Sequence, residues 1–230
     1  MSPWLALARA DRVNVLRDPM LLGASLAPLP LGGLVRFGGP WLHEAAPAVV
    51  DPTVLEAIVG SALLVLPALL AGTVQGYLLL EERDEHVEAA IRMTPLGTVG
   101  LWRWRLSTSF AMGLIGGGVA WGIAGLAIPA TWGLGLLVGA SHAPLIALIL
   151  ATYARDKVQG LALSKVTSLA AVAQVALLFP EPWAWLGAPF PAWWLARGLR
   201  PDAGAMVVAA TIVGAFAFHG AYFSRSTARS

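Results

Sequence analysis

The feature that most constrains this chain is the length of its apolar stretches. Residues 54–80 contain a single charged side chain, Glu56. About 20 mostly apolar residues in an α-helix are enough to cross the hydrocarbon core of a bilayer. Inside lipid the backbone has no water to bond, and a helix satisfies its own amide and carbonyl groups. The sequence therefore predicts an all-α membrane protein.

Composition supports this class and excludes others. Of the 230 residues, 57% are hydrophobic and 12% are charged, whereas soluble domains carry about 25% charged residues. Mean hydropathy is +0.71. Cysteine is absent, which excludes disulfides and cysteine metal sites. A net charge of +2 gives no reason to expect nucleic acid as a partner.

The apolar stretches predict six transmembrane helices in one domain, residues 1–230. Prolines fall inside three of these stretches, and membrane helices tolerate proline when neighbouring groups bond the freed carbonyls. Pro67 is predicted to kink the second span, and Pro28 and Pro30 lie in a short first span. The predicted spans cover about residues 20–37, 54–80, 106–128, 132–153, 161–179 and 203–223.

The distribution of lysine and arginine predicts the orientation. With the N-terminus inside, twelve of the 15 lysines and arginines lie on the cytoplasmic side, Arg103 and Arg105 among them, and three lie outside. Cytoplasmic loops carry such an excess, so both termini are predicted to be cytoplasmic. Residues 1–18 carry scattered charges instead of the apolar core of a signal peptide, and we expect an interfacial helix there.

The densest cluster of charge lies between the second and third spans and is predicted to form a short amphipathic helix over residues 84–94. Asp84 and Glu85 are expected in its first turn, where the helix dipole favours negative charge. Pro95 is expected to end it. One face is formed by residues at i, i+3, i+4 and i+7, namely Val87, Ala90, Ile91 and Thr94.

A helix of about three turns is not stable alone in water, so this one needs a surface to lie on. Two interpretations fit the residues equally. The helix rests on the lipid headgroups, or it docks in a groove on a cytoplasmic partner protein.

Three motifs resemble the type-2 ABC transporter permease family. "EERDEHVEAAIRMTPLG" followed by "WRWRLS" is similar to the family's cytoplasmic loop, which carries an acidic turn, a short coupling helix and a "TPL" before the next span. "RDKVQGLALSK" is similar to the segment between spans four and five, and "FPAWWLARGL" to the outer segment before the last span. The small six-span permeases that export drugs of the fluoroquinolone type are the most similar subgroup.

The resemblance implies a partner and a mechanism. It implies that the short helix is a coupling helix pushed by a cytoplasmic ABC ATPase, which binds ATP and magnesium, and that a second permease half, identical or homologous, completes the pathway. It also implies export by alternating access across the inner membrane of a bacterial cell. The residues that would couple to the ATPase are Glu82, Glu85, Val87, Glu88, Ile91, Arg92, Thr94 and Pro95.

Enzyme motifs are missing from the sequence. It contains no G-x-x-x-x-G-K-[S/T] for ATP, no H-E-x-x-H for zinc and no G-x-S-x-G for a nucleophile, so we expect a transporter subunit without a cofactor or metal of its own. Two rivals to an ATP-driven exporter remain. One is a secondary transporter or channel, and the other is a scaffold subunit of a membrane complex.

Polar residues inside the spans are candidates for a transport pathway, because polar groups in membranes face protein or water. Gln75, His142 and Gln174 are the candidates in the first five spans, and His219 lies in the sixth. The alternative is a structural hydrogen bond to a neighbouring helix.

Glycines and tryptophans leave two further questions open. Gly113 with Gly117, and Gly118 with Gly122, have the G-x-x-x-G spacing of closely packed helices, either between permease halves or within one half. The tryptophan-rich residues 180–202, predicted to form re-entrant or surface helices, fit an aromatic belt or an outer gate.

Overall fold

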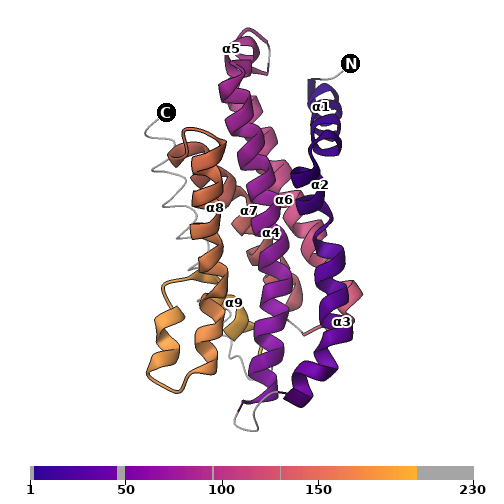
Figure 1. The fold of residues 1–230 in the computed structure, drawn as a ribbon, viewed down its shortest axis with the longest axis vertical. Coiled ribbons are helices and arrows are strands. Elements are labelled where there is room, and N and C mark those ends of the chain that lie inside the picture. The colour runs from indigo at the N-terminus through magenta and orange to yellow at the C-terminus, as the bar shows by residue number, and fades with distance from the viewer. Residues whose placement is uncertain (1–2, 46–49, 95, 130, 201–230) are drawn as a thin grey trace.

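The computed structural model describes residues 3–45, 50–94, 96–129 and 131–200. Over these residues the chain is a bundle of helices (Figure 1). The α-helices are α1 (Pro3–Arg17), α2 (Pro19–Leu26), α3 (Pro28–Ala45), α4 (Pro52–Asp84), α5 (Val87–Arg92), α6 (Gly97–Ala124), α7 (Trp132–Tyr153), α8 (Lys157–Val172) and α9 (Pro191–Gly198). Two short 3₁₀ helices, η1 (Ala173–Leu178) and η2 (Trp183–Gly187), lie between α8 and α9.

Four of the predicted spans have counterparts in the described part of the chain, and a fifth has one if a bent pair of helices is counted as a single span. Helices α4, α6, α7 and the continuous segment Lys157–Leu178 are long and apolar enough to cross a bilayer. The bent pair, Pro19–Leu26 and Pro28–Leu42, covers the first predicted span, and its two helices meet at 43°. Its break lies at the predicted prolines, because proline removes a backbone donor and its ring crowds the preceding turn. The sixth predicted span, 203–223, and His219 lie outside the described residues.

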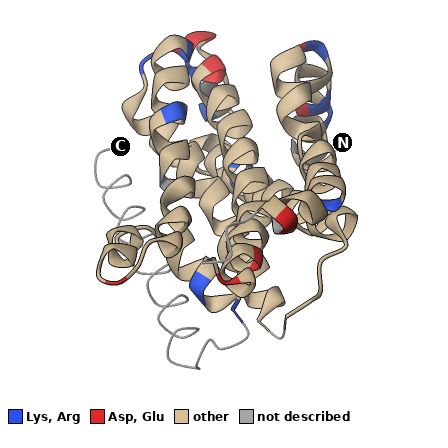
Figure 2. Cartoon of the chain, turned by 60° about the horizontal axis from the view of Figure 1, so that its bottom comes forward, with Lys and Arg blue, Asp and Glu red and all other residues tan. Residues whose placement is uncertain are grey.

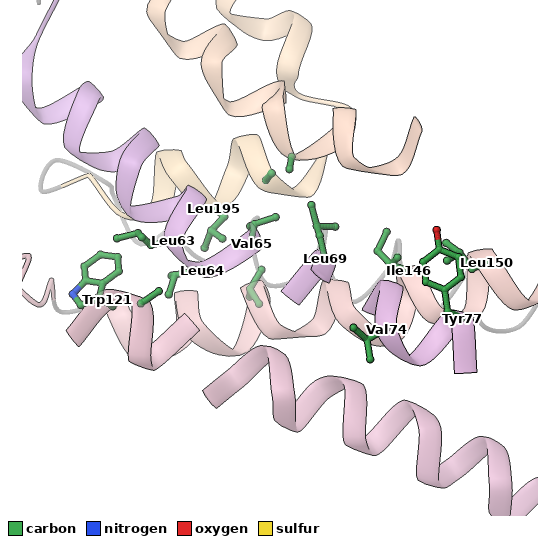
Figure 3. Close-up of a cluster of buried hydrophobic side chains, with 14 of the residues drawn as sticks. Leu63, Leu64, Val65, Leu69, Val74, Tyr77, Trp121, Ile146, Leu150 and Leu195 are labelled. Carbon is green, nitrogen blue, oxygen red and sulfur yellow. The ribbon is translucent and has the colours of Figure 1, made fainter. Parts of the chain in front are cut away.

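Helix α4 forms the centre of the bundle. It packs against α6 and α7 over most of its length and also contacts α2, α3, α8 and α9. Figure 3 shows its side chains facing those of the surrounding helices, and Leu64 and Val65 are fully buried. Lipid tails are as apolar as leucine, so close packing, rather than exclusion of water, holds such helices together.

Two glycines of α4 allow a close approach to α7. A Cβ atom on Gly72 would overlap the carbonyl oxygen of Ala143 and lie 2.8 Å from Cβ of Ile146. A Cβ atom on Gly76 would lie 2.9 Å from Cβ of Leu150. The two backbones can approach this closely only because these side chains are missing.

The glycine pairs of α6 face two different environments. A Cβ atom on Gly113 would lie 3.2 Å from Cα of Ala68, and one on Gly117 would lie 3.1 Å from a methyl carbon of Leu136. This pair therefore packs within the chain. No described atom lies within 4 Å of a Cβ atom built on Gly118 or Gly122, so the packing role of that pair stays a prediction.

The predicted boundaries of the short amphipathic helix were wrong. Helix α4 continues through Asp84, His86 takes a left-handed backbone conformation with φ of 56°, and α5 spans only Val87–Arg92. Asp84 and Glu85 thus lie at the C-terminal end of α4 instead of in a first turn, and the helix-dipole argument for them fails. Arg83 ties this end of α4 to α7, because its guanidinium donates to the carbonyl oxygens of Ala151 on α7 and of Ala154, the residue after α7.

The third span was also predicted to start too late. Helix α6 begins at Gly97, nine residues before the predicted start at Leu106, so "WRWRLS" is helical. At the opposite end of the bundle, Trp183–Gly187 forms η2 and Pro191–Gly198 forms α9, so this segment contains short helices, and their re-entrant or surface character stays a prediction. Trp193 is fully buried there, and the guanidinium of Arg197 lies 4.8 Å from the ring centre of Trp185. Trp193 therefore does not contribute to an aromatic belt, whereas exposed Trp183 fits one.

We expect Gly72→Ala to lower the free energy of unfolding by about 1–3 kcal/mol, because the added methyl group overlaps α7. Gly122→Ala is the matched control, since its methyl group meets no described atom. Unfolding of the purified protein by sodium dodecyl sulfate in mixed micelles measures both. Equal stability of the two variants would contradict the proposed packing of α4 on α7.

Candidate functional site

Arg105, which was predicted to lie on the cytoplasmic side, is buried within the bundle. Arg105 is in the third turn of α6, and its side chain is 2% exposed. Arg103, two residues earlier and so about 200° around the helix, is exposed. The predicted start of the third span at Leu106 left Arg105 outside the helix, whereas α6 begins at Gly97 and places this residue on the face that packs on α4.

Two carboxyl groups from distant parts of the chain bind the Arg105 guanidinium. Glu82, in the last turn of α4, accepts from Nε at 3.3 Å and also from Nη2. Asp11 of α1 accepts from Nη1 at 2.7 Å. Arginine presents its donors in a planar fork, so the pair with Glu82 fixes orientation as well as distance. We call Asp11, Gln75, Glu82 and Arg105 the buried charge cluster.

Gln75 connects this cluster to the middle of the bundle. Its Oε1 accepts from Nη1 of Arg105 at 3.1 Å, and its Nε2 lies 3.6 Å from the sulfur of Met112. The sequence predicted Gln75 as a pathway residue and Glu82 as a coupling residue. In the structure, both side chains accept hydrogen bonds from the guanidinium of Arg105.

Helix α1 meets α6 at the same place. Trp104 Nε1 donates to the second carboxylate oxygen of Asp11 at 2.8 Å, and the rings of Trp4 and Trp104 lie 5.9 Å apart. Asp11 thus bonds two consecutive side chains of α6. The cluster therefore joins three elements, α1, α4 and α6, near the end of the bundle that carries α5 (Figure 1).

Charges are otherwise concentrated near the ends of the bundle. Figure 2 shows lysine, arginine, aspartate and glutamate mainly near the two ends of the chain's helices, with few between them. One further ion pair near the α5 end joins Lys157 and Glu81 at 3.2 Å, and both side chains are partly exposed. Exposed pairs contribute little to stability, whereas a buried pair that loses one partner leaves an uncompensated charge.

An apolar pocket of about 240 Å³ lies next to the cluster. It is formed where α2 breaks into α3, opposite Pro67 and α6, and Met112 is part of its wall. A Cβ atom on Gly116 would lie 3.0 Å from Pro67 and 3.1 Å from Pro28, so this glycine keeps the space between the two prolines open. Pro67 lies near the middle of α4, so the pocket lies about halfway along this helix.

The other two predicted pathway residues lie elsewhere. Ser61 Oγ is 2.8 Å from Oε1 of Gln174, which joins α4 to η1. Nδ1 of His142 lies 3.0 Å from the Val138 carbonyl oxygen, one turn back in its own helix. Both residues are buried, and neither lines the pocket described above. A pathway role for them stays a prediction.

Helix α5 stands at the tip of the bundle, between the ends of α4 and α6 (Figure 1). The predicted apolar face is only partly formed: Val87 and Ile91 are half-buried, whereas Ala90 and Thr94 are exposed. Arg92 is exposed, and Met93 has 89% of its surface exposed. The side chain of Glu88 and the whole of Pro95 lie outside the described part of the structure.

Over the described ranges, no group of three histidine, aspartate or glutamate side chains is arranged to hold a metal ion. The described helices and their apolar lengths instead define a polytopic membrane protein, and its bundle holds a buried charge cluster.

Comparison with known protein families agrees with this class. The chain belongs to the family described as "Fluoroquinolones export permease protein Rv2686c-like", whose model matches residues 11–224. It is therefore a member of a drug-export permease family rather than of an enzyme family. Comparisons with curated proteins and with solved structures gave no significant match.

Sequence reasoning missed Arg105 and Asp11, although a signal for Arg105 was present. Arg105 lies four residues before Ser109 and eight before Gly113, and all three are buried on one face of α6. An arginine in register with small residues of a span indicates burial against a neighbouring helix. Asp11 had no comparable signal, because its partners are more than 90 residues away.

We expect Arg105→Met to lower the free energy of unfolding by about 3–5 kcal/mol, because two buried carboxyl groups lose their counter-charge. Arg103→Met removes an exposed arginine of the same helix and is expected to change stability by about 0.5 kcal/mol or less. Thermal unfolding in detergent, compared for the two variants, tests this. Similar melting temperatures for both would show that Arg105 is not buried as described.

Proposed function

We propose that this chain is the membrane-spanning permease subunit of an ATP-driven ABC exporter. The observation that carries the proposal is α5, a separate short helix that stands beyond the bundle between two spans, in a chain of the drug-export permease family. A partner that moves α5 acts directly on the ends of α4 and α6, which are its neighbours. ATP and magnesium are bound by separate ATPase subunits.

The proposed mechanism is alternating access. Two ATPase subunits close on ATP, displace α5 in each of two permease halves, and so change which side of the membrane the pathway faces. Such a change requires that ATP binding favours one state by a difference in binding free energy. The residues proposed to couple to the ATPase are Glu82, Glu85, Val87, Glu88, Ile91, Arg92, Thr94 and Pro95.

The proposed substrate is an amphipathic molecule of the fluoroquinolone type. The pocket at the α2–α3 break is apolar, lies about halfway along α4 and is bordered by Met112, whose flexible side chain adapts to ligands of different shape. Gln75, which lies next to Met112, is the polar pathway candidate that the geometry supports most strongly.

The proposed location is the inner membrane of a bacterium, with both termini and α5 in the cytoplasm. The excess of lysine and arginine supports this orientation. When buried Arg105 is removed from the twelve cytoplasmic charges, eleven remain against three outside.

Co-expression tests the proposed function. We expect the chain to copurify with an ABC ATPase encoded beside it, and the complex to hydrolyse ATP faster when a fluoroquinolone is added. A chain that transports the drug in proteoliposomes with no ATPase present would contradict the proposal.

We expect Ile91→Glu to detach the ATPase or to abolish drug-stimulated ATP hydrolysis, because it places a carboxylate on the half-buried side of α5. The control is Leu186→Glu, which changes an exposed apolar residue in η2, at the other end of the bundle. Copurification and hydrolysis rates of both variants are compared with the unchanged complex. If Ile91→Glu behaves like the control, α5 is not the docking surface.

We expect Gly116→Leu to reduce drug transport by about tenfold, because its side chain fills the pocket between Pro28 and Pro67. Gly118→Leu adds the same side chain to the same helix where no described atom lies within 4 Å. Uptake into inverted vesicles, normalised to the amount of folded protein, measures the effect. Equal transport by the two variants would exclude the pocket from the pathway.

A further inference from the structure

We propose that Arg105 is a positioning residue of the transport cycle. It transmits displacement of the α5 end of α4 to α1 on one side and to the pocket on the other. This inference rests on the proposed function, because it assumes that a partner moves α5 and the end of α4 next to it. In the described part of the structure no residue of α5 lines the pocket, so a displacement of α5 reaches the pocket only through other residues.

The first link is between Glu82 and Arg105. Glu82 lies two residues before the end of α4, and α5 begins five residues after it. A push on α5 therefore reaches Glu82 through a short segment. The carboxylate meets two donors of the planar guanidinium, so Arg105 follows a rotation of α4 as well as a translation.

The second link is Nη1 of Arg105, a single nitrogen atom that bonds two acceptors. Nη1 of Arg105 donates both to Asp11 at 2.7 Å and to Gln75 at 3.1 Å. A shift of the guanidinium that follows Glu82 changes both distances together. Through Asp11 it acts on α1, and through Gln75 it acts on Met112 in the pocket wall.

The polar character of the cluster also needs a reason. A well-packed apolar group of similar volume is often as stable as a buried ion pair, so stability alone does not account for an arginine here. Ionisable groups inside a membrane protein are costly and generally have a function. A guanidinium that donates to several acceptors can exchange its hydrogen bonds between discrete arrangements. Such exchange suits a residue that moves between two conformational states.

The first experiment uses the isolated chain in lipid nanodiscs. The chain has no cysteine, so Val13→Cys on α1 and Val99→Cys on α6 introduce two exposed spin-label sites. Double electron–electron resonance spectroscopy then measures the distribution of distances between the two spin labels. Arg105→Lys keeps the charge but loses the fork, and we expect it to broaden the distribution. Arg103→Lys is the control and should leave it unchanged. An unchanged distribution in Arg105→Lys would overturn the link to α1, whatever the energy source of transport.

The second experiment uses the complex with its ATPase and measures drug molecules transported per ATP hydrolysed. We expect Arg105→Lys and Asp11→Asn to lower this ratio by about tenfold while basal ATP hydrolysis is retained. A purely structural role predicts that transport and hydrolysis fall together, and that result would overturn the inference. Failure of the unchanged chain to support ATP hydrolysis with any partner would instead overturn the proposed function, and this inference with it.

Discussion

The bundle depends on the close approach of α4 to α7 at Gly72 and Gly76. In lipid, two apolar helices gain little from leaving their surroundings, so they associate where their backbones can come close and their side chains interlock. At these glycines the α7 side chains and the Ala143 carbonyl occupy the space that a methyl group would fill. The other described spans then pack around α4 and α7, and α4 contacts all of them.

This arrangement gives α4 three roles along its length. Its middle carries Pro67 and borders the apolar pocket, the turns that follow carry Gln75, and its last turn carries Glu82. Arg105 of α6 bonds both Gln75 and Glu82 of α4, and it also bonds Asp11 of α1. In a medium of low dielectric, separating hydrogen-bonded charges costs much free energy. When the α5 end of α4 is displaced, Glu82, Arg105 and Asp11 are therefore expected to move together.

The sequence predicted the parts of the fold that depend on local composition. Four apolar stretches correspond to single described helices and a fifth to the bent pair at Pro28, because hydropathy acts within a few residues. The bend itself was not predicted, although Pro28 and Pro30 were noted in this stretch. The helix at 84–94 was misplaced because the end of α4 is tied to α7 by Arg83, a contact between residues about 70 positions apart.

The same limit applies to the candidate site. Gln75 and Glu82 were selected from the sequence for separate reasons, and their meeting on Arg105 depends on how α4 and α6 face each other. Arg105 was counted among the cytoplasmic charges outside the spans because the start of the third span was placed at Leu106, the residue after it. Asp11 comes from a helix whose position is set by Trp104 and Arg105, so no pattern within residues 1–18 could identify it.

The central claim is that α5 is the surface on which another protein acts, and cross-linking tests it most directly. Met93 follows α5 and is almost fully exposed, and Met93→Cys would be the only cysteine of the chain. A photoactivatable cross-linker on this residue, used in membranes that contain the complex, should form an adduct with an ATP-binding chain, and nucleotide should change its yield. An adduct with lipid alone, unaffected by ATP, would contradict the account.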